Sequence, residues 1–156
     1  MKPIRWKQLL LCLLIPEAVG GLAGWLTSDA AALFETLHKP PLAPPAWAFP
    51  IAWAILYALM GISSYLILQG EGPKVKPALA VYGAQLAVNF LWPLVFFLGQ
   101  AYLLAFFILV LLYGLVLWMI RAFRPIRPAA ANLQLPYVLW LTYAAYLNLG
   151  VYLLNP

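Results

Sequence analysis

The chain has 156 residues, of which 66% are hydrophobic and 8% are charged. A soluble domain is about 45–50% apolar and about 25% charged, so this composition excludes a water-soluble fold and indicates that lipid surrounds most of the chain. The net charge of +5 comes from short basic clusters beside apolar runs, a distribution typical of membrane topology and headgroup contact rather than of nucleic-acid binding.

Five apolar runs are long enough to cross a bilayer, because about 20 helical residues span a ~30 Å hydrocarbon core. They lie at Trp6–Thr27, Ala46–Leu68, Ala78–Leu98, Ala101–Phe123 and Leu133–Leu154. Short alternating strands that could close a barrel are absent from the sequence, and only helices otherwise satisfy the backbone within lipid. We therefore predict an all-α membrane protein, a single domain over residues 1–156 that is a bundle of five transmembrane helices.

Basic residues divide unevenly between the two ends of these helices, as an odd number of crossings requires. Lys39 falls on one side, and the C-terminus adds no basic side chain there. The other side collects Lys2, Arg5, Lys7, Lys74, Lys76, Arg121, Arg124 and Arg127. This pattern predicts a multi-pass protein with a cytoplasmic N-terminus, and the lack of a long basic tail favours a bacterial cell membrane.

The first apolar run resembles a signal peptide in its basic start, but Glu17 interrupts it and further spans follow, so we assign it to the first helix. Glu17 lies about eleven residues into this helix, or ~16 Å along its axis, where a carboxylate is expensive. Its position favours either a functional role such as proton relay, or a protonated or paired group in a close helix junction beside Gly20, Gly21 and Gly24.

The longest connection, Ser28–Pro45, is rich in proline in its second half. Proline fixes the backbone in an extended form, so this segment is either a stiff lid or a simple lead into the second helix. It also holds His38, the only histidine, which in isolation beside Lys39 is more typical of a solvated side chain than of a haem ligand.

Three predicted helices carry aromatic and amide side chains along one face. The faces consist of Trp53, Tyr57, Gly61 and Ser64; of Gln85, Asn89, Trp92 and Phe96; and of Trp140, Ala144 and Asn148. Amides are costly in lipid unless they turn inward, so these faces should converge on the bundle interior. Their large aromatic and few amide side chains suit a flat aromatic ligand. Alternatively, the tryptophans form interfacial belts and the asparagines join helices.

A strip of small residues, Gly83-x-x-x-Ala87 with Ala80 and Ala84, lies on the third helix and permits close helix contact, either in a homodimer or within one chain. The single cysteine, Cys12, excludes an intrachain disulfide, and the sequence has no metal-ligand cluster, catalytic triad or phosphate-binding loop. We therefore expect no metal and no required cofactor.

Three segments resemble the translocator protein family, also known as TspO/MBR, the tryptophan-rich sensory proteins or peripheral-type benzodiazepine receptors. They are Lys39–Trp47 with Pro50–Trp53 and Leu56–Gly61, Gln85–Pro93 with Phe96-Phe97, and Pro136-Tyr137 through Trp140 to Asn148. The resemblance covers most of the chain in the right order.

This resemblance implies five helices around a pocket that the first loop closes, with porphyrins and hydrophobic drugs of the isoquinoline-carboxamide and benzodiazepine type as ligands. It also implies sensing, transport or light-dependent degradation of porphyrin, and dimerisation. The ligand-binding residues carried over by motif are Gly24, Ala46, Trp53, Tyr57, Asn89, Phe90, Pro93, Trp140, Ala144 and Asn148.

Whether the chain is an enzyme stays open at this point. If porphyrin is a substrate rather than only a ligand, Trp53 and Trp140 are the candidate catalytic residues, since indoles are readily oxidised. The alternative is a lipid or sterol transporter. The family's sterol segment requires a basic residue after a tyrosine, however, and here Tyr152 is followed by Leu153-Leu154, which weakens that alternative.

Overall fold

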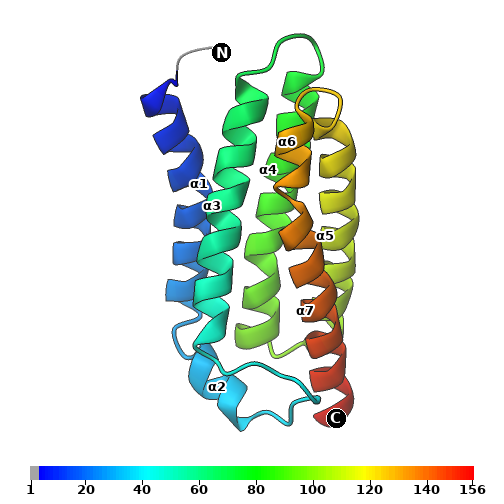
Figure 1. The fold of residues 1–156 in the computed structure, drawn as a ribbon. Coiled ribbons are helices and arrows are strands. Elements are labelled where there is room, and N and C mark those ends of the chain that lie inside the picture. Colours follow the sequence, from blue (N-terminus) through cyan, green and yellow to red (C-terminus); the bar gives the residue numbers. More distant parts are fainter. Residues whose placement is uncertain (1–3) are drawn as a thin grey trace.

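A computed structural model describes residues 4–156 of the chain (Figure 1). Lys2, one of the basic residues assigned to the cytoplasmic side, lies outside the described residues. The structure consists of helices, with bounds α1 Trp6–Leu26, α2 Ala30–Thr36, α3 Ala48–Leu68, α4 Val75–Pro93 continued by a π-helical turn Leu94–Leu98, α5 Tyr102–Phe123, α6 Pro128–Asn132 and α7 Leu135–Leu154. Five segments of the described chain are long and apolar enough to span a membrane, which confirms the predicted fold class.

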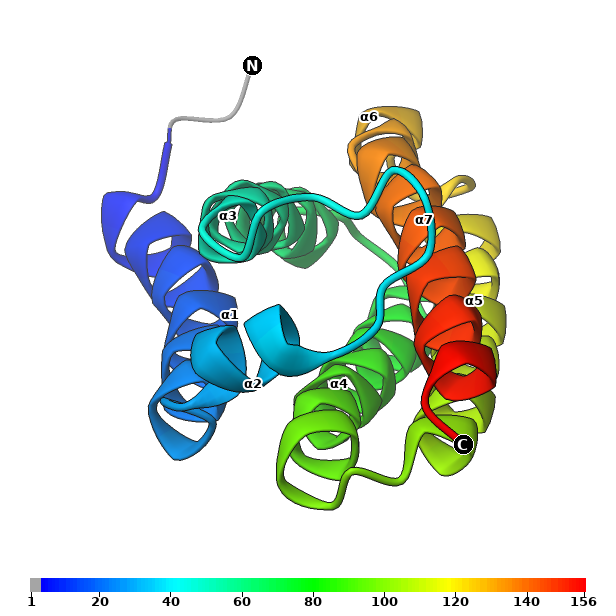
Figure 2. The same cartoon turned by 90° about the horizontal axis from the view of Figure 1, so that it is seen from below.

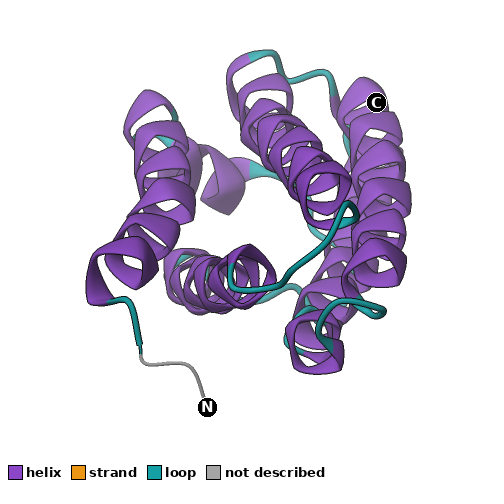
Figure 3. Cartoon of the chain, turned by 90° about the horizontal axis from the view of Figure 1, so that it is seen from above, coloured by secondary structure: helices purple, strands orange, loops and turns teal. Residues whose placement is uncertain are grey.

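The five spans alternate in direction, so that the two ends of the chain lie at opposite ends of the bundle (Figure 1). Helix α5 packs against both α4 and α7, whereas α1 packs mainly on α3. Near one end, the side chains of Gln8 and Gln69 are joined by a hydrogen bond of 2.8 Å between α1 and α3. Seen from above, α1 lies beside α3, on the side of the bundle away from α5 and α7 (Figure 3).

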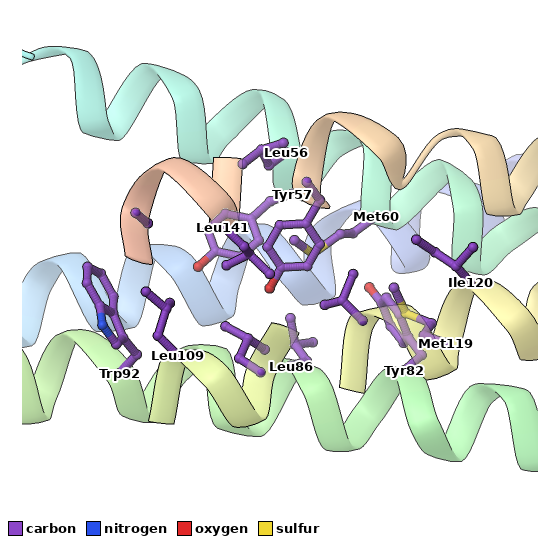
Figure 4. Packing of buried hydrophobic residues seen from close by; sticks show 14 of the residues in the cluster. Leu56, Tyr57, Met60, Tyr82, Leu86, Trp92, Leu109, Met119, Ile120 and Leu141 are labelled. Carbon is purple, nitrogen blue, oxygen red and sulfur yellow. The ribbon is translucent and has the colours of Figure 1, made fainter. Parts of the chain in front are cut away.

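Apolar side chains from α3, α4, α5 and α7 form the core of the bundle (Figure 4). Its fully buried members include Met60, Ile67, Leu109, Leu112, Val116, Met119, Phe123, Tyr137 and Leu141. Helix α1 contributes few buried residues, and its approach to α3 depends on Gly61, where a methyl group would lie 2.7 Å from the Cys12 carbonyl oxygen. Small residues allow this kind of close helix contact in membranes.

The observed helix bounds differ from the predicted ones at a few ends. The third span begins at Val75 rather than Ala78, because Pro77 falls in the first turn, where a missing N–H costs no intrahelical bond. The second span begins at Ala48 rather than Ala46, and short helices lie within two predicted connections, α2 in 28–45 and α6 in 124–132. Helix α6 begins with Pro128, a position that proline favours.

Candidate functional site

A cavity of about 610 Å³ lies between α1, α2, α3 and α4, in the half of the bundle nearer α2. Its volume falls within the roughly 300–1,000 Å³ typical of small-molecule sites. Seven aromatic residues border it: Phe34, Trp47, Phe49, Trp53, Tyr57, Trp92 and Phe97. The α1 wall carries no aromatic residue and consists mainly of small residues, including Gly20, Gly21 and Gly24, with Glu17 as its one acidic residue.

Polar side chains at the inner end of the cavity form a continuous hydrogen-bonded chain across α3, α4 and α7. The Tyr57 hydroxyl donates to Asn89 Oδ1 at 2.6 Å, and Asn89 Nδ2 donates to the Tyr137 hydroxyl oxygen at 2.7 Å. The Tyr137 hydroxyl donates in turn to Gln85 Oε1 at 3.1 Å. All four side chains are buried. Without these hydrogen bonds their polar groups would be unsatisfied inside the membrane, which would destabilise the fold. The predicted convergence of the polar faces is confirmed, and its amides hold helices together.

The aromatic side chains beyond this network contact one another edge to face or stacked. Trp53 stacks on Tyr57 with ring centroids 5.5 Å apart, and it meets the Trp140 ring edge to face at 6.3 Å. Phe49 bridges Phe34 of α2 and Trp140 of α7, at 5.0 and 5.9 Å. Such pairs favour fixed ring positions, so the aromatic wall presents a defined surface to a ligand.

The structure brings six of the ten predicted ligand-binding residues to the cavity: Gly24, Ala46, Trp53, Tyr57, Asn89 and Pro93. The three predicted residues of α7 lie elsewhere. Trp140 contacts Phe49 and Trp53 of the cavity wall, and its indole N–H is buried without a partner among the described residues. Ala144 is buried in the core, and Asn148 accepts a bond from Trp92 Nε1 at 3.0 Å while donating to the Tyr102 carbonyl at 2.7 Å.

Phe90 also lies outside the cavity, in a shallow depression with Val19, Leu22, Gly83, Leu86 and Ala87. Asn89 borders the cavity, whereas Phe90, the next residue of α4, faces this depression beside α1. The resemblance implies one ligand site for both neighbours, and the structure brings only Asn89 to the cavity.

Several residues that border the cavity were not predicted as ligand-binding. Two of them could have been predicted from the sequence, because Trp92 shares a helix face with Asn89 and Glu17 is a carboxylate at membrane depth. Phe34 and Phe49 could not have been predicted from the sequence, because their positions depend on how α2 folds over the end of the bundle.

The connection between α1 and α3 covers this end of the bundle (Figure 2). Its first half contains α2, whose Ala30, Ala31 and Phe34 border the cavity. Its second half is fastened to α7, where the Tyr146 hydroxyl donates to the Pro41 carbonyl at 2.7 Å and the Tyr143 hydroxyl donates to the Leu42 carbonyl at 2.5 Å. The α2 half of this connection therefore borders the cavity, and the proline-rich half is hydrogen-bonded to α7.

Glu17 is the single charged residue among the described residues that border the cavity, and no group of histidine, cysteine or carboxylate side chains within residues 4–156 could hold a metal. The site can therefore enclose a flat apolar ligand, stack against it and offer it few polar contacts.

Several known proteins are similar in sequence to this chain. The sequence model of the TspO/MBR family matches residues 12–154. The chain is 38% identical over 140 residues to a translocator protein of Ovis aries, covering 86% of this chain and 82% of that protein. It is 40% identical over 126 residues to a translocator protein homolog of Schizosaccharomyces pombe, covering 78% and 77%. It is 34% identical over 157 residues to the tryptophan-rich protein TspO of Chlorobaculum tepidum, covering 96% and 99%.

Proposed function

The chain belongs to the TspO/MBR family, and on that premise we propose that it binds a flat, hydrophobic aromatic ligand of the tetrapyrrole class in the cavity between α1 and α4. Hydrophobic drugs of the isoquinoline-carboxamide and benzodiazepine type are proposed ligands of the same cavity. The observation that carries this proposal is the cavity itself, about 610 Å³ with aromatic side chains on one wall and glycines on the other.

The two walls support this ligand class for different reasons. The rings of Trp53 and Tyr57 offer π faces against which a second ring system stacks, which adds about 0.5–1.5 kcal/mol for each pair beyond the burial of area. Gly21 and Gly24 leave open space, since a methyl group on either would meet no atom within 4 Å. A thin, broad molecule fills such a slot better than a compact one.

Filling the slot tests the proposal directly. Gly24→Phe places a ring in the open space of the cavity, and Gly114→Phe places the same ring on α5, where a methyl group also meets nothing within 4 Å and the residue is exposed. Protoporphyrin IX is titrated into each purified protein in detergent, with tryptophan fluorescence as the signal. We expect Gly24→Phe to lose at least about tenfold in affinity, or about 1.4 kcal/mol, and Gly114→Phe to match the wild type. Equal affinities for all three proteins would place the ligand elsewhere.

A second candidate function is light-dependent oxidative breakdown of the bound porphyrin, with dioxygen as the oxidant. The contact between Trp53, which borders the cavity, and Trp140 behind it favours this candidate, because two oxidisable indoles then lie in series beside the ligand. The porphyrin would absorb the light, and the pocket would orient it and exclude competing reactions.

Porphyrin absorbance before and during illumination distinguishes the two functions. A new absorbing product that forms with the wild type and fails to form with Trp53→Phe or Trp140→Phe, at unchanged affinity, supports catalysis. Equal bleaching with the variants and with empty micelles supports binding alone.

We propose that the protein lies in a bacterial cell membrane with its N-terminus in the cytoplasm. Alignment with nearly the whole Chlorobaculum tepidum relative supports the first part. The second is supported by the basic side chains of Arg5, Lys7, Lys74, Lys76, Arg121, Arg124 and Arg127, which gather at one end of the bundle, while Lys39 lies at the other.

We also propose a homodimer through α4. Gly83, Ala84 and Ala87 are exposed, and a methyl group on Gly83 would meet no atom within 4 Å. The small-residue strip therefore leaves room for a second helix, and a neighbouring copy could approach closely there.

A further inference from the structure

Glu17 places a carboxyl group in the wall of a cavity whose other described lining residues carry no ionisable acidic or basic group apart from the Tyr57 hydroxyl. It lies one helical turn before Gly20, whose Cα packs against the Tyr57 ring, so the carboxylate sits near the inner end of the slot. The other polar groups there, Tyr57 and Asn89, are already joined to each other at 2.6 Å.

No described residue donates a hydrogen bond to the Glu17 carboxylate or forms an ion pair with it. Among residues 4–156, none of the lysine, arginine or histidine side chains borders the cavity. Lys39, the basic residue at this end of the bundle, pairs with Glu35 at 3.2 Å. The chain therefore provides no positive partner for a carboxylate that lies at membrane depth, where an uncompensated charge is costly.

A ligand can provide that partner. Aromatic faces attract cations as well as rings, and Trp53 and Tyr57 border the same space as the carboxylate. An acidic side chain beside aromatic faces is a chemical environment suited to a protonated or quaternary nitrogen.

We infer that the Glu17 end of the cavity is a subsite for a positively charged nitrogen, so that the preferred ligands are flat aromatic molecules bearing an amine. This inference rests on the proposed function, because it specifies which aromatic ligands the cavity selects. It also sets an orientation. A ligand with carboxylates on one edge, such as a porphyrin with propionates, keeps that edge away from Glu17 and toward α2.

Two probes with the same ring test the subsite: 1-pyrenemethylamine, which is cationic at neutral pH, and 1-pyrenemethanol, which is neutral. Each is titrated into wild type, Glu17→Gln and Asp29→Asn in one neutral detergent, with energy transfer from tryptophan to pyrene as the signal. The quantity compared is the ratio of amine affinity to alcohol affinity, in which partition into micelles cancels between proteins. Asp29→Asn is the matched control, because it removes a carboxylate that lies outside the cavity lining.

We expect the amine-to-alcohol ratio to fall about tenfold in Glu17→Gln and to stay unchanged in Asp29→Asn. Gly24→Phe, which retains Glu17 but fills the slot, should remove the preference for the amine as well, and this variant serves if Glu17→Gln fails to fold.

An unchanged ratio in folded Glu17→Gln overturns the inference, since Glu17 would then act as a neutral group. If both probes still bind in that case, the proposed aromatic site is supported even though the subsite is not. An equal fall in Glu17→Gln and Asp29→Asn would indicate general surface charge and would also overturn it. Failure of the wild type to bind either probe overturns both the subsite and the proposed aromatic site.

Discussion

Gly20 is the point at which α1 meets the polar network, so replacing it by alanine tests the packing of the site. A methyl group on Gly20 would lie 2.6 Å from Cδ2 and 2.8 Å from Cζ of the Tyr57 ring, well inside van der Waals contact. The ring is held in place, because its hydroxyl is hydrogen-bonded to Asn89 at 2.6 Å and its face is stacked on Trp53.

The cost can be worked from these contacts. Overpacking of a fixed site lowers the free energy of unfolding by about 1–3 kcal/mol. Replacing glycine by alanine in a helix raises it by about 1 kcal/mol. Gly114→Ala gains the helix preference without the clash, because a methyl group there meets no atom within 4 Å. We therefore expect Gly20→Ala to be less stable than Gly114→Ala by about 1–3 kcal/mol.

Unfolding by sodium dodecyl sulfate from mixed micelles, followed by circular dichroism, measures this difference. The same substitution in a Tyr57→Phe background should cost less, since the hydrogen bond that the displaced ring would lose is already absent, and coupled neighbours depart from additivity by about 0.5–3 kcal/mol. If Gly20→Ala and Gly114→Ala are equally stable, or if the cost is the same in both backgrounds, the reasoning is refuted.

Three further predictions concern the network, the connection and the lipid-facing strip. Asn89→Leu removes the group that joins Tyr57 to Tyr137 and should lower the free energy of unfolding by about 1–3 kcal/mol, whereas Asn132→Leu, at an exposed position of α6, should have little effect in the same unfolding assay. The double variant Tyr143→Phe, Tyr146→Phe loses both hydrogen bonds to the Pro41 and Leu42 carbonyls, so amide hydrogen exchange should rise at Leu42 and Ala43, which carry amide hydrogens between the prolines, and stay unchanged in α3; equal exchange in wild type and variant would show that these bonds do not hold the segment. Gly83→Ile should reduce cross-linked dimer without lowering thermal stability, while Gly114→Ile leaves dimer unchanged; dimer retained in Gly83→Ile would exclude this strip as the interface.

Hydropathy and charge were sufficient to predict the spans, because lipid requires every backbone polar group to be hydrogen-bonded within the chain and favours long apolar runs. The cost of polar groups in lipid also identified Tyr57 and Asn89, because the Tyr57 hydroxyl and the Asn89 amide must face inward at that depth. Helix α2 was not predictable in this way, since its seven residues are too few to show a reliable period and its position depends on packing over the bundle end.

Spacing could not decide which inward-facing residues border the cavity. Trp140, Ala144 and Asn148 share a face that points into the bundle, yet Phe49 and Trp53 contact Trp140, and Asn148 is bonded to Trp92 and Tyr102. Whether an inward residue meets ligand or another side chain depends on the sizes of the rings between helices, which only the assembled bundle defines. Phe90 likewise lies next to Asn89 in the sequence, yet it borders the depression beside α1 and not the cavity.

In the proposed function, the ligand lies in the space between the glycines of α1 and the aromatic wall of α3 and α4. A crystal structure of the protein grown with protoporphyrin IX in a lipid mesophase tests this most directly. We expect density for the ring between Gly21, Gly24 and Trp53, under Phe34 of α2. Density on the lipid-facing side of α5, or in the depression beside Phe90, with the cavity empty would contradict it.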